Sequence, residues 1–257
     1  MTLALPTLFS LEGRTALVTG GNSGIGKAIA LALAEAGANV VLLARDRARL
    51  EEAVRSIEAF GHGAAWFDCD LADRVAVADA ALRAAKPFGA PDILVNAAGI
   101  NRRPPLSRLT ADDWDATLRL NLDTPFFLAQ ALVPAMIERR WGRIINLASL
   151  QSIRSFNNSG AYGVSKAGIA QLTRVQAEAW SNKGINCNAI APGFFRTPLT
   201  RAVFDDPQRA AALAARTMIG RNGELDDVRG LAVLLASRAS DYITGQVIFL
   251  DGGFSAG

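Results

Sequence analysis

The chain has 257 residues, of which half are hydrophobic and a fifth are charged, a composition that predicts a globular protein with a full core. Its 27 basic and 24 acidic side chains are spread along the chain and leave a net charge of +3, so the sequence offers no basic arm for nucleic acid. No apolar run reaches the ~18 residues of a membrane span, and residues 1–11 lack the pattern of a signal peptide. We therefore expect a cytoplasmic protein that binds neither nucleic acid nor a membrane.

Short apolar segments alternate with helical patterns from the N-terminus onward. Residues 15–18 form the first apolar segment, and after a glycine-rich turn Ile25, Ile29 and Leu33 recur at the spacing of one helix face. Further strands are predicted, in chain order, at residues 40–44, 64–67, 93–95, 143–147, 186–190 and 247–250. Helices are predicted between them, around Leu50, Val54 and Ile57 and over residues 72–85, 114–137 and 162–180.

The predicted strands are apolar on both faces, which indicates a sheet that is covered on both sides. Strands of this kind that alternate with amphipathic helices predict an α/β fold, with a seven-stranded parallel sheet and helices on both faces. Right-handed crossovers then give the doubly wound Rossmann architecture. No linker, repeat or low-complexity tract divides the chain, so we expect residues 1–257 to form a single domain.

The turn between the first strand and the first helix is the earliest sign of function. It reads Thr19-Gly20-Gly21-Asn22-Ser23-Gly24-Ile25-Gly26, with the glycine spacing G-x-x-x-G-x-G. Glycines there let the backbone approach a pyrophosphate, and free N–H groups at the helix N-terminus bind the anion. A tight connection without a ligand would also need glycine, but the position after the first strand favours a nucleotide. The candidate cofactor residues here are Gly20, Asn22, Ser23, Gly24, Ile25 and Gly26.

The end of the second strand indicates which nucleotide is bound. An acidic residue there would bind the ribose hydroxyls of NAD and repel a 2′-phosphate. This chain has Ala44 followed by Arg45, which leaves room for the phosphate and provides a guanidinium to hold it. Arg45 is alternatively a solvated charge, and Asp46 is better placed to cap the next helix than to bind ribose. We predict NADP(H) as the cofactor, with NAD(H) as the alternative.

A serine, a tyrosine and a lysine form the candidate catalytic group. Tyr162 and Lys166 are four residues apart at the start of a predicted helix, so both side chains lie on one face. A lysine ammonium ~4 Å from the phenol would lower its pKa by about two to three units. Ser149 follows the fifth strand, where ligands bind in such sheets, and its hydroxyl can hold a substrate oxygen in line with Tyr162. Taken alone, a tyrosine and a lysine at this spacing are usually a packed ring beside a solvated amine.

Several separate motifs occur in one order and at one set of spacings. They are the glycine turn, Asn96-Ala97-Ala98-Gly99, Asn121, Ser149, Tyr162-Gly163-Val164-Ser165-Lys166 and Pro192-Gly193. This set resembles the short-chain dehydrogenase/reductase family over essentially the whole chain. The resemblance implies an NAD(P)-dependent enzyme that interconverts a secondary alcohol and a ketone without a metal.

The resemblance also implies roles for individual residues. Tyr162 is expected to be the general acid and base, Ser149 to orient the substrate oxygen, and Lys166 to hold the nicotinamide ribose and lower the tyrosine pKa. Asn121 is expected to keep a water in a proton relay behind Lys166, or to brace the long helix as a buried amide, and the two roles are compatible. The other implied cofactor contacts are Asp70 and Leu71 at the adenine, Asn96 and Gly99 at the ribose with Ala97 between them, and Pro192, Gly193 and Thr197 at the nicotinamide.

Within the family, residues 99–103, 149–152 and 190–197 are similar to sugar-acid dehydrogenases of the gluconate 5-dehydrogenase kind. This likeness implies a sugar acid or polyol as the small-molecule substrate, with Arg103, Ser149 and Gln151 as its contacts. Arg103 is expected to reach the substrate in preference to Arg102, although both are alternatively solvated loop residues. Residues 153–158 depart from that group and bring Ile153 and Phe156 near the pocket, so a reductase of less polar ketones or 3-oxoacyl groups is the alternative.

The remaining features predict no further site. Cys69 and Cys187 lie in apolar segments without a second cysteine or histidine nearby, so we expect buried, reduced thiols and neither a disulfide nor a metal. His62 lies between two glycines and is expected in a loop. A cofactor-binding regulator that lost catalysis would lack one of the catalytic groups, and all are present. Family likeness implies a homotetramer built through residues 114–137 and 162–180.

Overall fold

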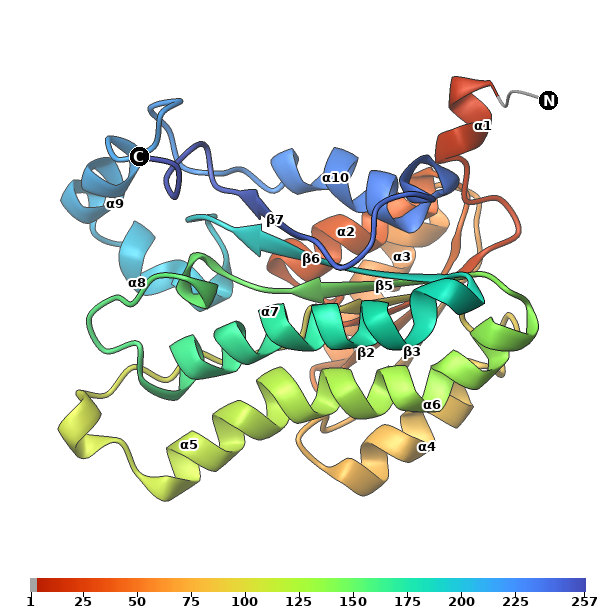
Figure 1. Cartoon of the computed structure of the whole chain (residues 1–257), viewed down its shortest axis with the longest axis horizontal. Coiled ribbons are helices and arrows are strands. Elements are labelled where there is room, and N and C mark those ends of the chain that lie inside the picture. The colour runs from red at the N-terminus through yellow and green to blue at the C-terminus, as the bar shows by residue number, and fades with distance from the viewer. Residues whose placement is uncertain (1–3) are drawn as a thin grey trace.

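The structure, a computed structural model, describes residues 4–257 and contains a seven-stranded sheet in which all neighbouring strands are parallel (Figure 1). The strand order is β3-β2-β1-β4-β5-β6-β7. The order reverses beside β1, and such a switch point leaves a crevice at the carboxyl ends of the strands. The expected Rossmann fold is confirmed. The strands are β1 (Thr15–Thr19), β2 (Asn39–Ala44), β3 (Ala64–Asp68), β4 (Ile93–Asn96), β5 (Gly142–Leu147), β6 (Ile185–Pro192) and β7 (Val247–Leu250).

Helices cover both faces of the sheet, as Figure 1 shows. Ala16 and Val18 of β1 pack in the core under one helix layer, and Leu17 between them packs in the core under the other. Because successive side chains of a strand point to opposite faces, a strand covered on both sides is apolar throughout. The first layer contains α2 (Gly24–Glu35), α3 (Arg47–Glu58) and α10 (Asp227–Ala236), and the second contains α4 (Arg74–Ala84), α6 (Thr124–Glu138) and α7 (Gly160–Trp180). Smaller helices are α1 (Leu5–Phe9), α5 (Ala111–Leu118), α8 (Arg201–Phe204) and α9 (Pro207–Ala214).

The predicted strands are all present, with ends within two residues of the expected ones. The helix expected over residues 72–85 begins later, at Arg74, because the Asp73 carboxylate caps it and accepts a hydrogen bond from the Val75 N–H at 2.9 Å. Asp46 caps α3 in the same way, as predicted, and accepts from the Arg49 N–H at 3.1 Å. Its carboxylate is therefore used by the helix.

The helix expected over residues 114–137 is longer and less regular than predicted. It starts at Ala111, and a π turn over Arg119–Asp123 separates α5 from α6. Such turns insert an extra residue into a helix and are frequent at functional sites. The whole stretch Ala111–Glu138 has 28 residues and a mean hydropathy of 1.2, which meets the length and composition of a membrane span. It packs against α4, α7 and β5, as the core helix of a globular protein does.

Candidate active site

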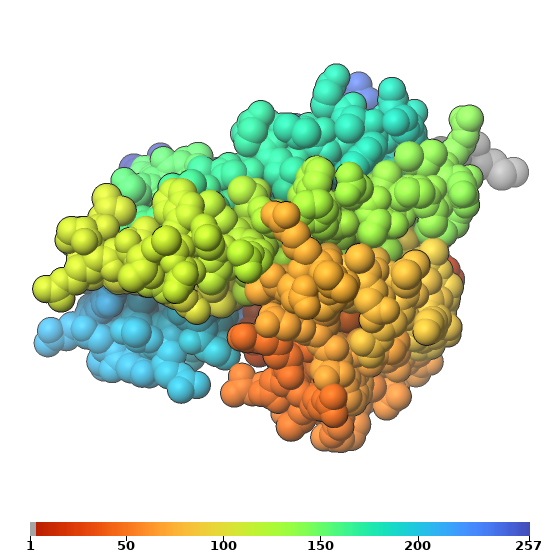
Figure 2. All heavy atoms as spheres, turned by 90° about the horizontal axis from the view of Figure 1, so that it is seen from below, coloured from red at the N-terminus to blue at the C-terminus, as the bar shows by residue number. Residues whose placement is uncertain are grey.

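The carboxyl ends of the strands open into a cavity of about 980 Å³. Its walls come from the turn after β1, the ends of β2, β4 and β5, the start of α7, and the segment after β6. Figure 2 shows the recess between the light-blue segment that carries α8 and α9 and the orange N-terminal segment. The predicted site residues that line it are Gly20, Asn22, Ser23, Gly24, Ile25, Gly26, Arg45, Asp70, Leu71, Ala97, Gly99, Arg103, Ser149, Gln151, Tyr162, Lys166, Pro192, Gly193 and Thr197.

Two glycines of the first turn are required by close backbone contacts. A Cβ on Gly20, whose φ is +65°, would lie 2.9 Å from the backbone N and Cα of Ala98. A Cβ on Gly26 would lie 2.4 Å from the carbonyl oxygen of Gly20. Thr19 fastens the same contact, because its Oγ1 accepts hydrogen bonds from the N–H groups of Ala97 and Ala98, both at 3.1 Å. The turn is thus held against the end of β4, and bare backbone faces the cavity.

The N-terminus of α2 faces this cavity as well. Ser23 is the N-cap residue, but its hydroxyl makes no capping hydrogen bond to the first turn. The first N–H groups of a helix have no partner within the helix, and its dipole places partial positive charge at the same end. Ser23, Gly24 and Ile25 line the cavity, so this end fits the pyrophosphate of a dinucleotide.

The arginines after β2 differ in their partners. Arg47 pairs with Asp68 at 2.6 Å, and the Arg49 Nε lies 3.3 Å from the Asp46 carboxylate. Arg45 is exposed at the cavity and forms no ion pair with the described residues. Arg49 also lines the cavity, although the sequence analysis did not select it. Arg45 is therefore the arginine that is free to hold a 2′-phosphate beside the small side chain of residue 44.

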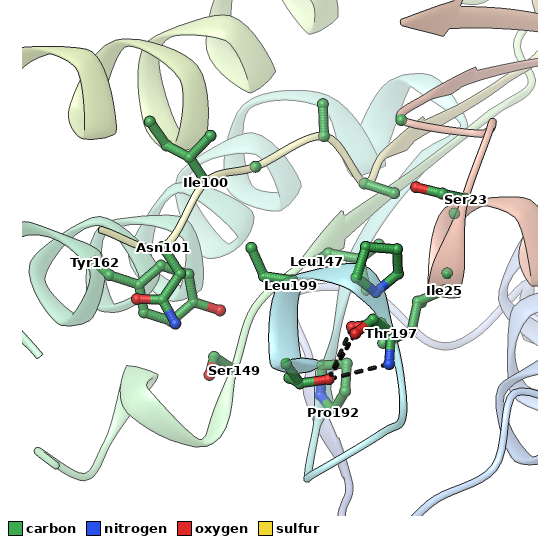
Figure 3. Close-up of a pocket in the computed structure, with 18 of the residues that line it drawn as sticks. Ser23, Ile25, Ile100, Asn101, Leu147, Ser149, Tyr162, Pro192, Thr197 and Leu199 are labelled. Carbon is green, nitrogen blue, oxygen red and sulfur yellow. Dashed lines mark hydrogen bonds between the residues drawn. The ribbon is translucent and has the colours of Figure 1, made fainter. Parts of the chain in front are cut away.

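Ser149 and Tyr162 lie on one side of the cavity, and Ser23 and Ile25 of the glycine turn lie on the opposite side (Figure 3). The Ser149 Oγ accepts a hydrogen bond from the Gln151 N–H at 3.1 Å in the short turn after β5. Ser152, at the end of that turn, donates its hydroxyl to the Lys166 carbonyl at 2.7 Å. This bond fastens the serine turn to α7, which carries Tyr162.

Lys166 lies one helical turn after Tyr162 and is also buried. Its Nζ donates a hydrogen bond to the carbonyl of Leu147 at 2.5 Å and lies 5.7 Å from the centre of the Tyr162 ring. Burial lowers the pKa of Lys166 to about 8. The ammonium is held at the end of β5 by this hydrogen bond.

The acidity of Tyr162 differs from the expectation. Burial raises the pKa of Tyr162, and this effect outweighs the hydrogen bond from Ser149 and the charge of Arg103, which both lower the pKa. Lys166 is not among the groups that shift the pKa of Tyr162, and its ammonium donates to the Leu147 carbonyl. The cation that favours the phenolate in this structure is Arg103.

Two of the predicted site residues do not line the cavity. Asn121, in the π turn, accepts a hydrogen bond from the Ile100 N–H at 2.9 Å and donates to the Ile100 carbonyl and to Ser165 Oγ. Its amide braces the loop after β4 against α7, which is the second of the two roles expected for it. The side chain of Asn96 is buried and points from β4 toward β5, where it donates to Asn146 Oδ1 at 2.9 Å.

The substrate end of the cavity contains Arg103 but not Arg102. The Arg102 guanidinium turns outward to the Asp113 carboxylate, at 2.6 Å. The Arg103 Nη2 donates to the Asn157 carbonyl at 2.6 Å, and no carboxylate among the described residues pairs with this arginine. The expected preference for Arg103 over Arg102 therefore agrees with the structure.

Two buried amide oxygens at this end have no hydrogen-bond partner among the described residues, namely Gln151 Oε1 and Asn101 Oδ1. Asn101 lines the cavity together with Tyr162 and was not predicted, although a polar residue two positions before Arg103 was a usable signal. Phe156 lines the cavity as expected, whereas Ile153 is 62 % exposed and lies outside it.

The chain is similar to known proteins over nearly its full length. Residues 20–255 match a short-chain dehydrogenase/reductase family model described as Enoyl-(Acyl carrier protein) reductase. The chain is 39 % identical to the gluconate 5-dehydrogenase of Gluconobacter oxydans, over 97 % of this chain and 98 % of the relative. It is 40 % identical to the 2-dehydro-3-deoxy-D-gluconate 5-dehydrogenase of Pseudoalteromonas atlantica, over 96 % of this chain and 97 % of the relative.

A solved structure is similar to the same extent. The gluconate 5-dehydrogenase of Burkholderia cenocepacia, in complex with NADP and tartrate, superposes with a TM-score of 0.94 at 40 % identity, covering 99 % of this chain and all of the other. The sequence, the fold and the arrangement of Ser149, Tyr162 and Lys166 around one cavity all indicate the same family. The chain belongs to the short-chain dehydrogenase/reductase family, whose members are NAD(P)-dependent oxidoreductases that act on CH–OH and C=O groups.

Proposed function

We propose that this protein is an NADP(H)-dependent oxidoreductase that interconverts the secondary alcohol and the ketone of a sugar acid, as a gluconate 5-dehydrogenase does. The observation that carries the proposal is Arg103, an arginine without a carboxylate partner that shares the cavity with Ser149 and Tyr162. A guanidinium there can hold the acid group of a substrate. The direct test is reduction of 5-keto-D-gluconate with NADPH, followed by cofactor absorbance, beside neutral ketoses and apolar ketones.

The residues around the cavity suit this chemistry. The bound nicotinamide supplies or accepts the hydride. Ser149 holds the substrate oxygen, and Tyr162 donates its phenolic proton to that oxygen as negative charge develops during reduction. In oxidation the tyrosine acts as the base, and nearby cations stabilise the phenolate. The buried position of Tyr162 excludes water from the proton transfer, and the two hydrogen bonds that fasten Ser149's turn keep its geometry fixed.

NADP(H) is the cofactor in this proposal. The Burkholderia enzyme carries NADP in its crystal structure. Here Ala44 and the unpaired Arg45 stand at the end of β2, where the 2′-phosphate of NADP would lie.

Arg45→Ala is expected to weaken NADPH much more than NADH. The preference for NADPH over NADH should fall by ~1.5–3 kcal/mol, the range for a hydrogen bond to a charged group. Dissociation constants of both reduced cofactors, measured by fluorescence titration, give this difference directly. Arg47→Ala is the matched control, because Arg47 is paired with Asp68 and does not line the cavity. A wild-type protein that prefers NADH would contradict the assignment of Arg45.

Arg103→Gln is expected to raise the KM for sugar acids about 10- to 100-fold, since a charged hydrogen bond to the carboxylate is lost. The KM for a neutral ketose should change little. Arg102→Gln is the control, because this arginine is paired with Asp113 outside the cavity. Equal losses for acidic and neutral substrates would show that Arg103 supports the loop and binds no carboxylate.

A reductase of less polar ketones or 3-oxoacyl groups is the second candidate, and an aromatic cluster favours it. Phe156 and Phe194 line the cavity with ring centres 5.9 Å apart, and Phe254 packs on both. Turnover of apolar ketones with none of 5-keto-D-gluconate would select this candidate. A cofactor-binding regulator would bind NADPH and turn over nothing in the same panel.

We further propose a homotetramer that forms through α5, α6 and α7 and resides in the cytoplasm. Phe126, Val164 and Val175 on these helices are 37–53 % exposed, and covering them would remove apolar surface from water. Both cysteines are free and buried, which suits a reducing compartment. Light scattering of the purified protein tests the assembly.

A further inference from the structure

The far side of the substrate end is built by the segment after β6. Thr197 and Thr200 cap its first turn with hydrogen bonds at 3.0 Å, drawn as dashed lines in Figure 3. Asp206 then caps α9 and accepts a hydrogen bond from the Arg209 N–H at 3.0 Å. This cap sets the first turn of α9 at the rim of the cavity, which Arg209 lines together with Arg103.

Arg209 has the features of a residue that binds an anionic ligand. It is exposed, and it forms no ion pair with the described residues, whereas Arg221 further along pairs with Asp227 at 2.6 Å. It lies in the first turn of α9, where the helix dipole disfavours a cation. Helix stability therefore gives no reason for an arginine at this position.

Arg103 and Arg209 also act on each other. The charge of Arg209 adds to burial in lowering the pKa of Arg103, so the two guanidinium groups lie within electrostatic reach. The acidic residues that line the cavity, Asp46 and Asp70, lie at its adenosine end. Neither guanidinium forms an ion pair with the described residues, since Asp206 accepts only from the backbone N–H of Arg209. Two like charges at one end of a cavity repel each other until a negatively charged ligand enters.

We propose that Arg209 is a second carboxylate-binding residue, which joins Arg103 around the acid group of the substrate and selects sugar acids over neutral polyols. This proposal rests on the proposed function of the site and adds a determinant from a different element. Arg103 is fixed by its bond to the Asn157 carbonyl and keeps its other N–H groups free, whereas Arg209 approaches from α9. A planar fork from each side would orient the carboxylate and so fix which carbon faces the hydride donor.

The test compares Arg209→Gln with Arg201→Gln in the full-length enzyme. Arg201 is an exposed arginine on α8, in the same segment, that does not line the cavity. Arg209→Gln should raise the KM for 5-keto-D-gluconate about tenfold, the low end for a charged hydrogen bond because the side chain is exposed. The kcat should stay within about threefold and the KM for NADPH should not change, since the lost contact binds ground state and transition state alike. Arg201→Gln should behave as wild type.

Two further readouts separate charge from folding. The KM of the wild-type enzyme should rise with added salt, and that rise should be smaller in Arg209→Gln. Arg209→Lys should recover part of the affinity, because it restores the charge without the fork. An Arg209→Gln variant with an unchanged KM, or one whose kcat and NADPH affinity fall together with the KM, would overturn the proposal. Absence of turnover of any sugar acid by the wild-type enzyme would instead reject the proposed function.

Discussion

Tyr162→Phe is expected to reduce the turnover of both reduction and oxidation by ~10²–10⁴-fold or more, while NADPH binding is retained. Removing the hydroxyl takes away the proton donor and leaves the substrate oxygen held by Ser149 alone. A loss of this size corresponds to about 3 to 5 kcal/mol of transition-state stabilisation, the range of general acid catalysis. The ring is buried on α7 and phenylalanine keeps its shape, so the fold should be unaffected.

The control is Tyr242→Phe, since Tyr242 is the other tyrosine of the chain and is fully exposed. The pH dependence gives a second measurement. Because burial raises the pKa of Tyr162, oxidation, which needs the phenolate, should rise with pH through the alkaline range. Reduction needs the protonated phenol and should be constant at neutral pH and fall at high pH. Near-normal turnover in Tyr162→Phe would remove this residue from the mechanism.

Lys166→Met is expected to lower turnover by at least ~10²-fold and to make the protein more stable at neutral pH. The activity should fall because the site loses the group expected at the cofactor ribose. The gain in stability follows from burial, which lowers the pKa of Lys166 from 10.5 to about 8. At about 1.4 kcal/mol per unit, holding the charged amine in the fold costs roughly 3 kcal/mol.

The sign of this effect depends on pH. Below pH 8 the amine is charged in both states, so the folded state carries the full cost. Between pH 8 and 10.5 the folded protein releases the proton that the unfolded chain still holds, and the cost disappears as the pH rises. The hydrogen bond from the charged amine to the Leu147 carbonyl is worth ~1.5–3 kcal/mol, which leaves a net gain of at most about 1.5 kcal/mol at pH 7, or up to about 5 °C in Tm.

Thermal unfolding of wild type and variant from pH 7 to 10.5 measures this gain and its loss. Lys183→Met, at an exposed position, should change neither activity nor Tm. A Lys166→Met protein that is less stable at pH 7 and active at a normal rate would contradict both parts of the expectation. In that case the lysine would serve the fold and not the reaction.

The sequence predicted the sheet well because each strand carries its own signal, an apolar run bounded by turns. Asp46 as a cap was also predictable from local chemistry, and Arg103 rather than Arg102 in the cavity from the resemblance to the family. The π turn at Asn121 was not, and the bonds that its side chain makes to Ile100 and Ser165 join residues that are remote in sequence. The same holds for the pKa of Tyr162, which depends on how completely the fold removes water from the ring.

The helices after β6 were not predicted from the sequence, for a different reason. α10 has Val228, Ala232 and Leu235 buried at helical spacing, so this helix was predictable from hydrophobic periodicity. α9 has no buried residue, so hydrophobic periodicity gives no information on its place. Arg209 could therefore be connected to the cavity only by the folded chain.

The tight contact of Gly20 with Ala98 bears on how such an enzyme can change over generations. Any side chain at Gly20 would collide with backbone 2.9 Å away, so the dinucleotide end tolerates almost no variation. α9 at the opposite end buries none of its side chains, and replacements on such a helix usually alter the free energy of unfolding by less than about 0.5 kcal/mol. Mutations can thus accumulate where the substrate is selected without endangering the fold or the reaction. Descendants of this protein could therefore acquire new substrates through substitutions in one short surface segment.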